Sequence, residues 1–197
     1  VQGVHFSLDT TGWRDLGWKS MAVSLSDIAA MGGSPSYALV SLALPSSSLA
    51  EDIEQLYQGM TELADKHGVA IVGGDTSAAP VLFINLAVIG RAGRRLLTRS
   101  AARAGDLVAV TGHLGAAAGG LRLLQEKRQA VKADAHLRQA FLRPCPRLDA
   151  AEALVATGVR CAIDISDGLL ADLGHICQSS RAGAVIEATK VPVHPAL

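Results

Sequence analysis

The sequence predicts a mixed α/β protein with two domains, and two observations lead to this prediction. Short apolar segments typical of strands alternate with longer segments of helical periodicity along the chain. The charge pattern then changes at residues 91–105, which contain no acidic residue before Asp106. Such a run is typical of a solvated connector, so we expect domains over residues 1–92 and 93–197. The arginines of this segment are Arg91, Arg94, Arg95, Arg99 and Arg103.

The first domain is expected to contain two helices and three strands. Apolar residues at helical spacing are followed by Gly32-Gly33, which ends the first helix. Ser46–Ser48 are suitable caps for the second helix. We expect helices over residues 13–31 and from this cap to about His67, and strands over residues 37–44, 69–72 and 81–90.

The second domain is expected to repeat the alternation of strand and helix. Its helix after residues 111–115 is rich in small residues, and the prolines at Arg143–Arg147 separate the next helix, which begins at about Leu148. A further helix follows the turn Asp164–Leu169. We expect strands over residues 107–110, 161–163 and 184–188.

Composition excludes several classes of protein. The 197 residues are 49% hydrophobic, and 18 Lys+Arg balance 18 Asp+Glu, so neither disorder nor electrostatic binding to nucleic acid or an anionic membrane is expected. The longest apolar stretch, Val81–Ile89, contains Asn85 and is far shorter than the roughly 20 residues of a membrane span. The three cysteines have no C-x-x-C spacing, which predicts reduced thiols and a cytoplasmic protein.

Four carboxylates lie where an apolar element meets a turn: Asp27, Asp75, Asp164 and Asp167. Two such charges 4 Å apart repel by about 4 kcal/mol at an effective dielectric constant of 20, and a hard divalent cation removes this cost. Taken alone, Asp27 fits a solvent-facing acid. The set predicts a Mg²⁺ site, and with it phosphate, and it predicts that Asp27, Asp75 and Asp164 approach one another. The histidines show no metal-binding spacing.

Candidate phosphate-binding groups are sparse. Gly73-Gly74 allows the backbone to approach an anion closely, and Arg99 is a candidate phosphate clamp because guanidinium binds bidentately. Thr111–Gly115 lies between a strand and a helix, but it matches neither a Walker A nor a G-x-G-x-x-G motif and by itself favours a tight structural turn. No arrangement typical of a nucleophilic triad is visible.

An ordered series of motifs resembles the thiamine-monophosphate kinases of the aminoimidazole-ribotide-synthetase-like superfamily. The resemblance covers essentially the whole chain, and the long serine-aspartate helix followed by G-G-D-T and D-x-S-D-G-L is its most specific part. The matching segments are Gly3–Phe6, Gly17–Gly32, Gly73–Thr76, Leu97–Ser100, Thr111–Gly115, Arg143–Arg147 and Asp164–Leu169.

The resemblance implies the two-domain α/β fold of that superfamily and a homodimer. It also implies an enzyme that transfers a phosphoryl group directly from ATP to thiamine phosphate with Mg²⁺, without a catalytic side chain. The implied metal ligands are Asp27, Asp75, Asp164 and Asp167. The implied ATP contacts are Gly74, Asp75, Arg99, Ser166 and Tyr57, of which Tyr57 fits helix packing equally well. His5 matches a position that faces thiamine phosphate.

Parts of the family pattern are not found in these residues. A glycine-aspartate-aspartate segment and a serine/threonine-aspartate strand would precede Val1, and a glycine-glycine-glutamate-aspartate-tyrosine motif would follow Leu197. We therefore expect an internal piece of a longer kinase, truncated at both termini, and the activity of the piece alone stays open. The alternatives are another ATP-using enzyme of the superfamily (hydrogenase maturation, selenophosphate or aminoimidazole ribotide synthesis) and a non-catalytic ATP-binding or dimerisation module.

Overall fold

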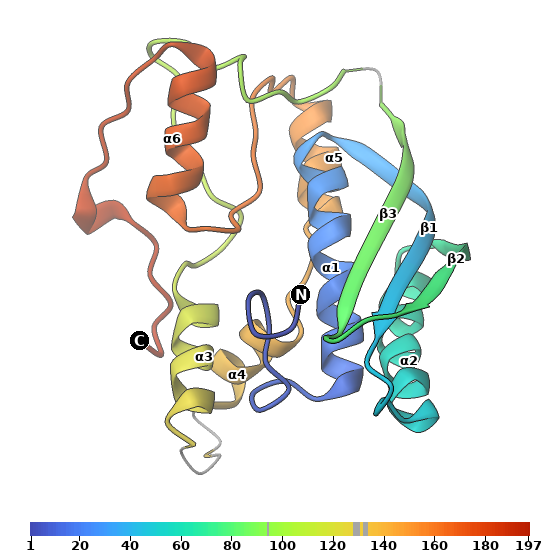
Figure 1. The fold of residues 1–197 in the computed structure, drawn as a ribbon. Coiled ribbons are helices and arrows are strands. Elements are labelled where there is room, and N and C mark those ends of the chain that lie inside the picture. Colours follow the sequence, from blue (N-terminus) through green and yellow to red (C-terminus); the bar gives the residue numbers. More distant parts are fainter. Residues whose placement is uncertain (94, 128–130, 132–133) are drawn as a thin grey trace.

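A computed structural model describes residues 1–93, 95–127, 131 and 134–197 (Figure 1). Arg94 of the predicted connector lies outside these residues. The mixed α/β class predicted from the sequence is confirmed. Within the described residues, no helix combines the length and apolarity needed to cross a membrane.

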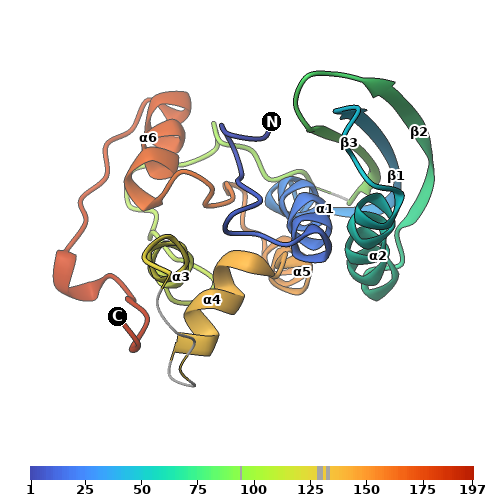
Figure 2. The same cartoon turned by 60° about the horizontal axis from the view of Figure 1, so that its bottom comes forward.

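The first half of the chain is a pair of helices packed on a three-stranded sheet. The sheet has the order β2-β1-β3, with β1 parallel to β2 and antiparallel to β3. Helices α1 and α2 lie side by side and both contact the sheet (Figure 2). The elements are α1 (Trp13–Ala30), β1 (Gly33–Leu44), α2 (Ala50–Lys66), β2 (Ala70–Ala78) and β3 (Phe83–Ala92).

Two glycines allow the backbones of α1 and α2 to touch. A Cβ atom on Gly17 would lie 1.9 Å from the carbonyl oxygen of Leu56, and one on Gly59 would lie 1.8 Å from that of Arg14. No side chain fits at either position without separating the helices. The main core forms where this helix pair meets the inner face of β1, and its most deeply buried members include Met21, Leu25, Val40, Leu56, Met60 and Leu63.

The other face of the sheet is not covered by the residues that the structure describes. Ala38, Val40 and Leu42 of β1 point toward the helices and are buried, whereas the alternate residues Tyr37 and Leu39 are exposed. On β3, Ile89 pairs with Tyr37, Phe83 pairs with Ala43 on the same outward face, and both are exposed. We call Tyr37, Leu39, Phe83 and Ile89 the outward row.

The regular secondary structure of the second half is helical. It contains α3 (Ala116–Gln125), α4 (Ala135–Leu142), α5 (Leu148–Ala156), α6 (Leu169–Ser180) and the short 3-10 helix η2 (Ala188–Lys190). The strands expected over residues 107–110, 161–163 and 184–188 are wrong, because the described residues after Ala92 form no strand. A strand needs neighbours that complete its hydrogen bonds, and these segments have no such partners among the described residues.

A clamp connects the second half to α1 and α2. Arg143 pairs through Nε with Asp15 at 2.5 Å and through Nη1 with Glu62 at 3.2 Å. Beside it, the indole nitrogen of Trp18 donates a hydrogen bond to the carbonyl oxygen of Pro144 at 2.9 Å. We call these five residues the Arg143 clamp.

Candidate active site

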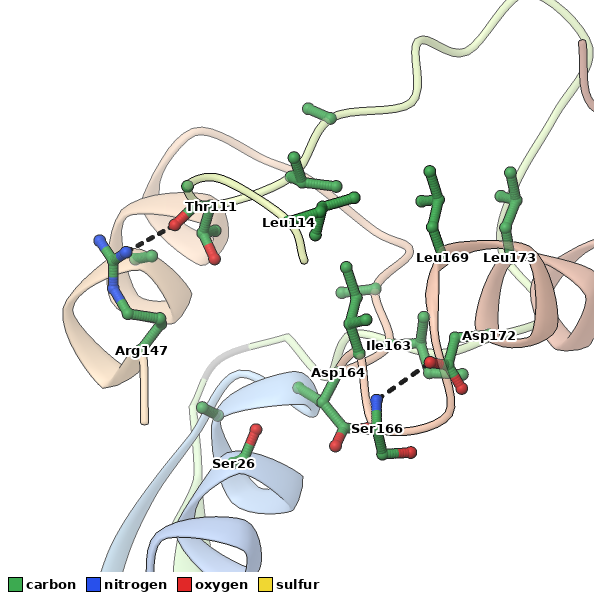
Figure 3. Close-up of a pocket in the computed structure, with 18 of the residues that line it drawn as sticks. Ser26, Thr111, Leu114, Arg147, Ile163, Asp164, Ser166, Leu169, Asp172 and Leu173 are labelled. Carbon is green, nitrogen blue, oxygen red and sulfur yellow. Dashed lines mark hydrogen bonds between the residues drawn. The ribbon is translucent and has the colours of Figure 1, made fainter. Parts of the chain in front are cut away.

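A cleft of about 1490 Å³ separates one face of α1 from the second half of the chain. Lys19, Val23, Ser26 and Ala30 recur at helical spacing and line the α1 side. The opposite side is formed by residues 107–114, by residues 159–166 and by parts of α5 and α6 (Figure 3). Ser20 and Ser24 of α1 do not line the cleft, and their hydroxyls donate hydrogen bonds to carbonyl oxygens of α1 itself.

Asp164 lines this cleft and forms an acidic pair with Asp27 of α1. Burial raises the pKa of Asp164 above its usual value, and the negative charge of Asp27 raises it further. The positive charge of Arg99 opposes this rise in the pKa of Asp164. In Figure 3 the Asp164 carboxylate points toward the end of α1 that carries Ser26. Asp27 and Asp164, which are far apart in the sequence, thus lie within electrostatic range of each other.

The segment Asp164–Gly168 presents further predicted site residues. Ser166 and Asp167 are exposed, and Ser166 lines the cleft together with Asp164. The loop is tied to α6 by Asp172, a buried acid that sequence reasoning missed. The available signal was an acidic residue in the first turn of a helix, a position at which carboxylates cap backbone N–H groups.

Asp75 does not lie beside Asp27 and Asp164 in space. It is the register partner of Ser41 on β1, which alternates with the buried Val40 and Leu42 and so belongs to the face of the sheet turned away from α1. The expected approach of Asp75 to Asp27 and Asp164 is not seen within the chain. Gly74 has a structural reason to be glycine, because a Cβ atom there would lie 1.7 Å from the carbonyl oxygen of Val40.

The remaining predicted contacts are dispersed. His5 is exposed in the N-terminal loop. Tyr57 on α2 packs against the main core and borders a shallow groove with Arg14 and Glu62 instead of lining the cleft. The 111–115 turn is held by Arg147, whose Nη1 donates a hydrogen bond to the Thr111 carbonyl oxygen at 2.5 Å.

The acidic pair can contribute ligands to a hard cation, but the described residues do not form a complete metal site by themselves. Within the part of the chain that the structure describes, no group of three or more His, Cys, Asp or Glu side chains is arranged to hold a metal ion. Asp27 and Asp164 nevertheless supply carboxylate oxygens whose mutual repulsion a divalent cation would relieve. Mg²⁺ commonly takes only one or two carboxylates and completes its shell with water and phosphate.

Comparisons with known proteins give one consistent answer. The family model of the AIR synthase related protein N-terminal domain matches residues 1–92, and that of the C-terminal domain matches residues 103–197. The thiamine-monophosphate kinase of Buchnera aphidicola subsp. Schizaphis graminum is 39% identical over 196 residues, which are 98% of this chain and 59% of the relative.

Solved structures agree with the sequence relatives. The crystal structure of thiamine-monophosphate kinase from Stenotrophomonas maltophilia K279a matches with a TM-score of 0.90 and 41% identity over 99% of this chain and 63% of that one. AaThiL complexed with AMPPCP and TMP matches with a TM-score of 0.86 and 35% identity over 91% of this chain and 58% of that one. The chain therefore spans about three fifths of the length of these relatives.

Proposed function

Because the chain belongs to the AIR synthase related proteins, we propose that the protein containing it phosphorylates thiamine phosphate to thiamine diphosphate with ATP. The observation that supports this most directly is that the charges of Asp27 and Arg99 both act on Asp164, which lines the cleft. These residues lie in a chain similar over 98% of its length to a thiamine-monophosphate kinase. Two carboxylates and a guanidinium within electrostatic range of one another suit a metal-bound polyphosphate.

The proposed roles follow from charge. Asp27 and Asp164 would hold Mg²⁺, with Asp167 as a further ligand from the same chain and Asp75 as one supplied across the pairing of two copies, and the metal neutralises phosphate charge when bound. Arg99 and Ser166 contact the phosphates of ATP, and His5 faces thiamine phosphate. We include Gly74 and Tyr57 as nucleotide contacts on the resemblance alone. No general base is needed, because the acceptor is a phosphate that is already nucleophilic; catalysis then consists of positioning and charge stabilisation.

We further propose domains over residues 1–92 and 93–197 and a cytoplasmic homodimer that pairs through the outward row. Exposed apolar side chains gathered on one sheet face are typical of an interaction surface. Asp75 belongs to the same face by register, so this pairing would place it at the interface between the two copies.

The test is turnover by the full-length protein, with ATP, Mg²⁺ and thiamine phosphate as reactants. We expect thiamine diphosphate as the product and a loss of about 10²–10³ in kcat for Asp164→Asn, the usual cost of losing one charge-stabilising group. Asp65→Asn on the exposed side of α2 is the control and should be fully active. Turnover of other acceptors but not of thiamine phosphate, or a normal rate for Asp164→Asn, would contradict the proposal.

Asp75→Asn provides a second arm of the same test. We expect it to abolish transfer while leaving the melting temperature without ligands nearly unchanged, because Asp75 is exposed and lies outside the main core. Near-normal turnover would remove Asp75 from the mechanism. A large loss of stability without ligands would make it a structural residue.

A further inference from the structure

One buried carboxylate holds the loop that precedes α6. Asp172 is only 3% exposed, although it lies in the first turn of a helix that borders the cleft. Its Oδ2 atom accepts hydrogen bonds from three consecutive backbone N–H groups, those of Ser166 at 3.0 Å, Asp167 at 3.1 Å and Gly168 at 3.0 Å. Figure 3 shows the first of these bonds.

The position of this carboxylate has an electrostatic consequence. The first N–H groups of a helix have no partner within the helix and carry a partial positive charge, which commonly makes the N-terminus a phosphate site. At α6 the carboxylate of Asp172 binds instead the three N–H groups of residues 166–168, which directly precede the helix. These loop N–H groups are therefore already used, and a phosphate group beside them would meet the negative charge of Asp172.

The same three bonds orient the predicted site residues. Because the N–H groups of residues 166–168 all point to one buried atom, the peptide planes of this segment are fixed relative to α6. Gly168 supports the turn with a φ of +114°, which side chains other than glycine rarely allow. The exposed side chains of Ser166 and Asp167 and the half-buried Asp164 are therefore displayed from a rigid segment.

We propose that Asp172 is a positioning residue for phosphoryl transfer, which keeps the N–H groups of residues 166–168 from binding phosphate and holds Asp164, Ser166 and Asp167 in place for Mg²⁺ and ATP. The inference rests on the proposed function of this cleft, and it assigns a role to a residue that touches neither ligand. The nucleotide phosphates are then recognised by side chains of the loop and by Arg99, not by the N–H groups of residues 166–168.

The experiment compares Asp172→Ala, Asp172→Asn and the control Asp52→Ala in the full-length protein. Asp52 also lies in the first turn of a helix, α2, but has no bond to the loop. We expect Asp172→Ala to raise the Mg²⁺ concentration for half-maximal activity and to lower kcat, by about 10–100-fold in total, as is usual for partners of metal ligands. Added formate, a small carboxylate that fits the vacated place, should restore part of the activity. Asp172→Asn should fall between the wild type and Asp172→Ala.

A folded Asp172→Ala variant with wild-type kcat and Mg²⁺ dependence would overturn the proposal. If that variant does not fold, Asp172→Asn keeps the shape of the side chain, and wild-type values for it would overturn the proposal equally. Hydrogen exchange tests the role of Asp172 independently of the proposed kinase activity. The amides of residues 166–168 should exchange about tenfold faster in the Asp172 variants than in Asp52→Ala, whether or not thiamine phosphate is the substrate. Unchanged exchange would contradict the role of Asp172 directly.

Discussion

The two halves of the chain bury their apolar residues very differently. In the first half, α1, α2 and the sheet enclose one continuous core in which Met21, Leu25 and Leu56 have no exposed surface. In the second half, the described core cluster consists of Ala116, Leu123 and Leu137 with Ala140 packed against it. Leu107 and Val185, in segments expected to be strands, are 96% and 93% exposed.

The difference shows what each kind of element requires. A helix completes its hydrogen bonds within its own segment, so the helices of the second half form on a small core. A strand depends on neighbours, and only the first half has them among the described residues. The cleft consequently lies between a well-packed helix, α1, and a more weakly packed side that contributes Asp164.

The largest expected effect on stability comes from truncating a buried leucine, and the two cores can be compared through one leucine from each. Leu25→Ala should lower the free energy of unfolding by about 4 kcal/mol, because it leaves a cavity in a closely packed site. Leu123→Ala removes the same atoms from a site with fewer buried neighbours and should cost about 2 kcal/mol. Urea unfolding followed by circular dichroism measures both. Equal losses would show that the second cluster is packed as tightly as the first.

A pair of glycine substitutions sharpens the comparison. Gly17→Ala forces a Cβ atom against the backbone of Leu56 and should cost about 3 kcal/mol, since the two helices must move apart. Gly174→Ala in α6 meets no atom within 4 Å and should stabilise the protein by up to about 1 kcal/mol through helix propensity. Thermal melting shows whether each substitution raises or lowers stability. A destabilising Gly174→Ala would reveal a neighbour of α6 that the described residues do not include.

The sequence predicted the first half well because its signals are local. The helix expected over residues 13–31 is observed as Trp13–Ala30, and it ends at the predicted glycine pair. The strand expected over residues 69–72 is instead Ala70–Ala78. Gly73-Gly74 suggested a turn, but Gly74 is required by its close approach to Val40 on the neighbouring strand. Such a contact between strands leaves no local trace in the sequence.

The candidate site was predictable only in part. Asp27 and Asp164 were singled out because each lies at the end of an apolar element, and the structure brings them together. Asp172 was missed because most acids in a first helical turn face solvent, and only its burial and its three hydrogen bonds distinguish it. The place of Asp75 depends on strand register, which periodicity alone does not predict.

Lys19 allows the cleft itself to be probed by pH. Its ammonium lies 3.5 Å from the centroid of the Phe141 ring, and burial lowers its pKa from 10.5 to about 8. Above pH 8 the unfolded chain binds the proton more readily than the folded one does, so stability should rise as the pH increases from 8 to 10.5. Lys19→Met should therefore stabilise the protein by a few degrees at pH 7, and this gain should disappear near pH 10.5. A gain that is independent of pH would mean that Lys19 keeps its ordinary pKa.

The smallest effect concerns the Arg143 clamp, which joins the two halves. Burial opposes the charged form of Glu62, but Arg143 and Arg14 together outweigh it and hold the pKa of Glu62 below its usual 4.5. A carboxyl with a lowered pKa stabilises the folded state above its ordinary pKa, and this contribution is lost as the pH falls through the folded value. Between pH 5 and pH 3 the wild-type melting temperature should therefore fall slightly more steeply than that of Glu62→Gln. Glu54→Gln, on the exposed face of the same helix, should follow the wild type. If Glu62→Gln also shows the wild-type slope, the clamp holds the halves together through Asp15 and the Trp18–Pro144 hydrogen bond, and the ion pair with Glu62 adds nothing in solution.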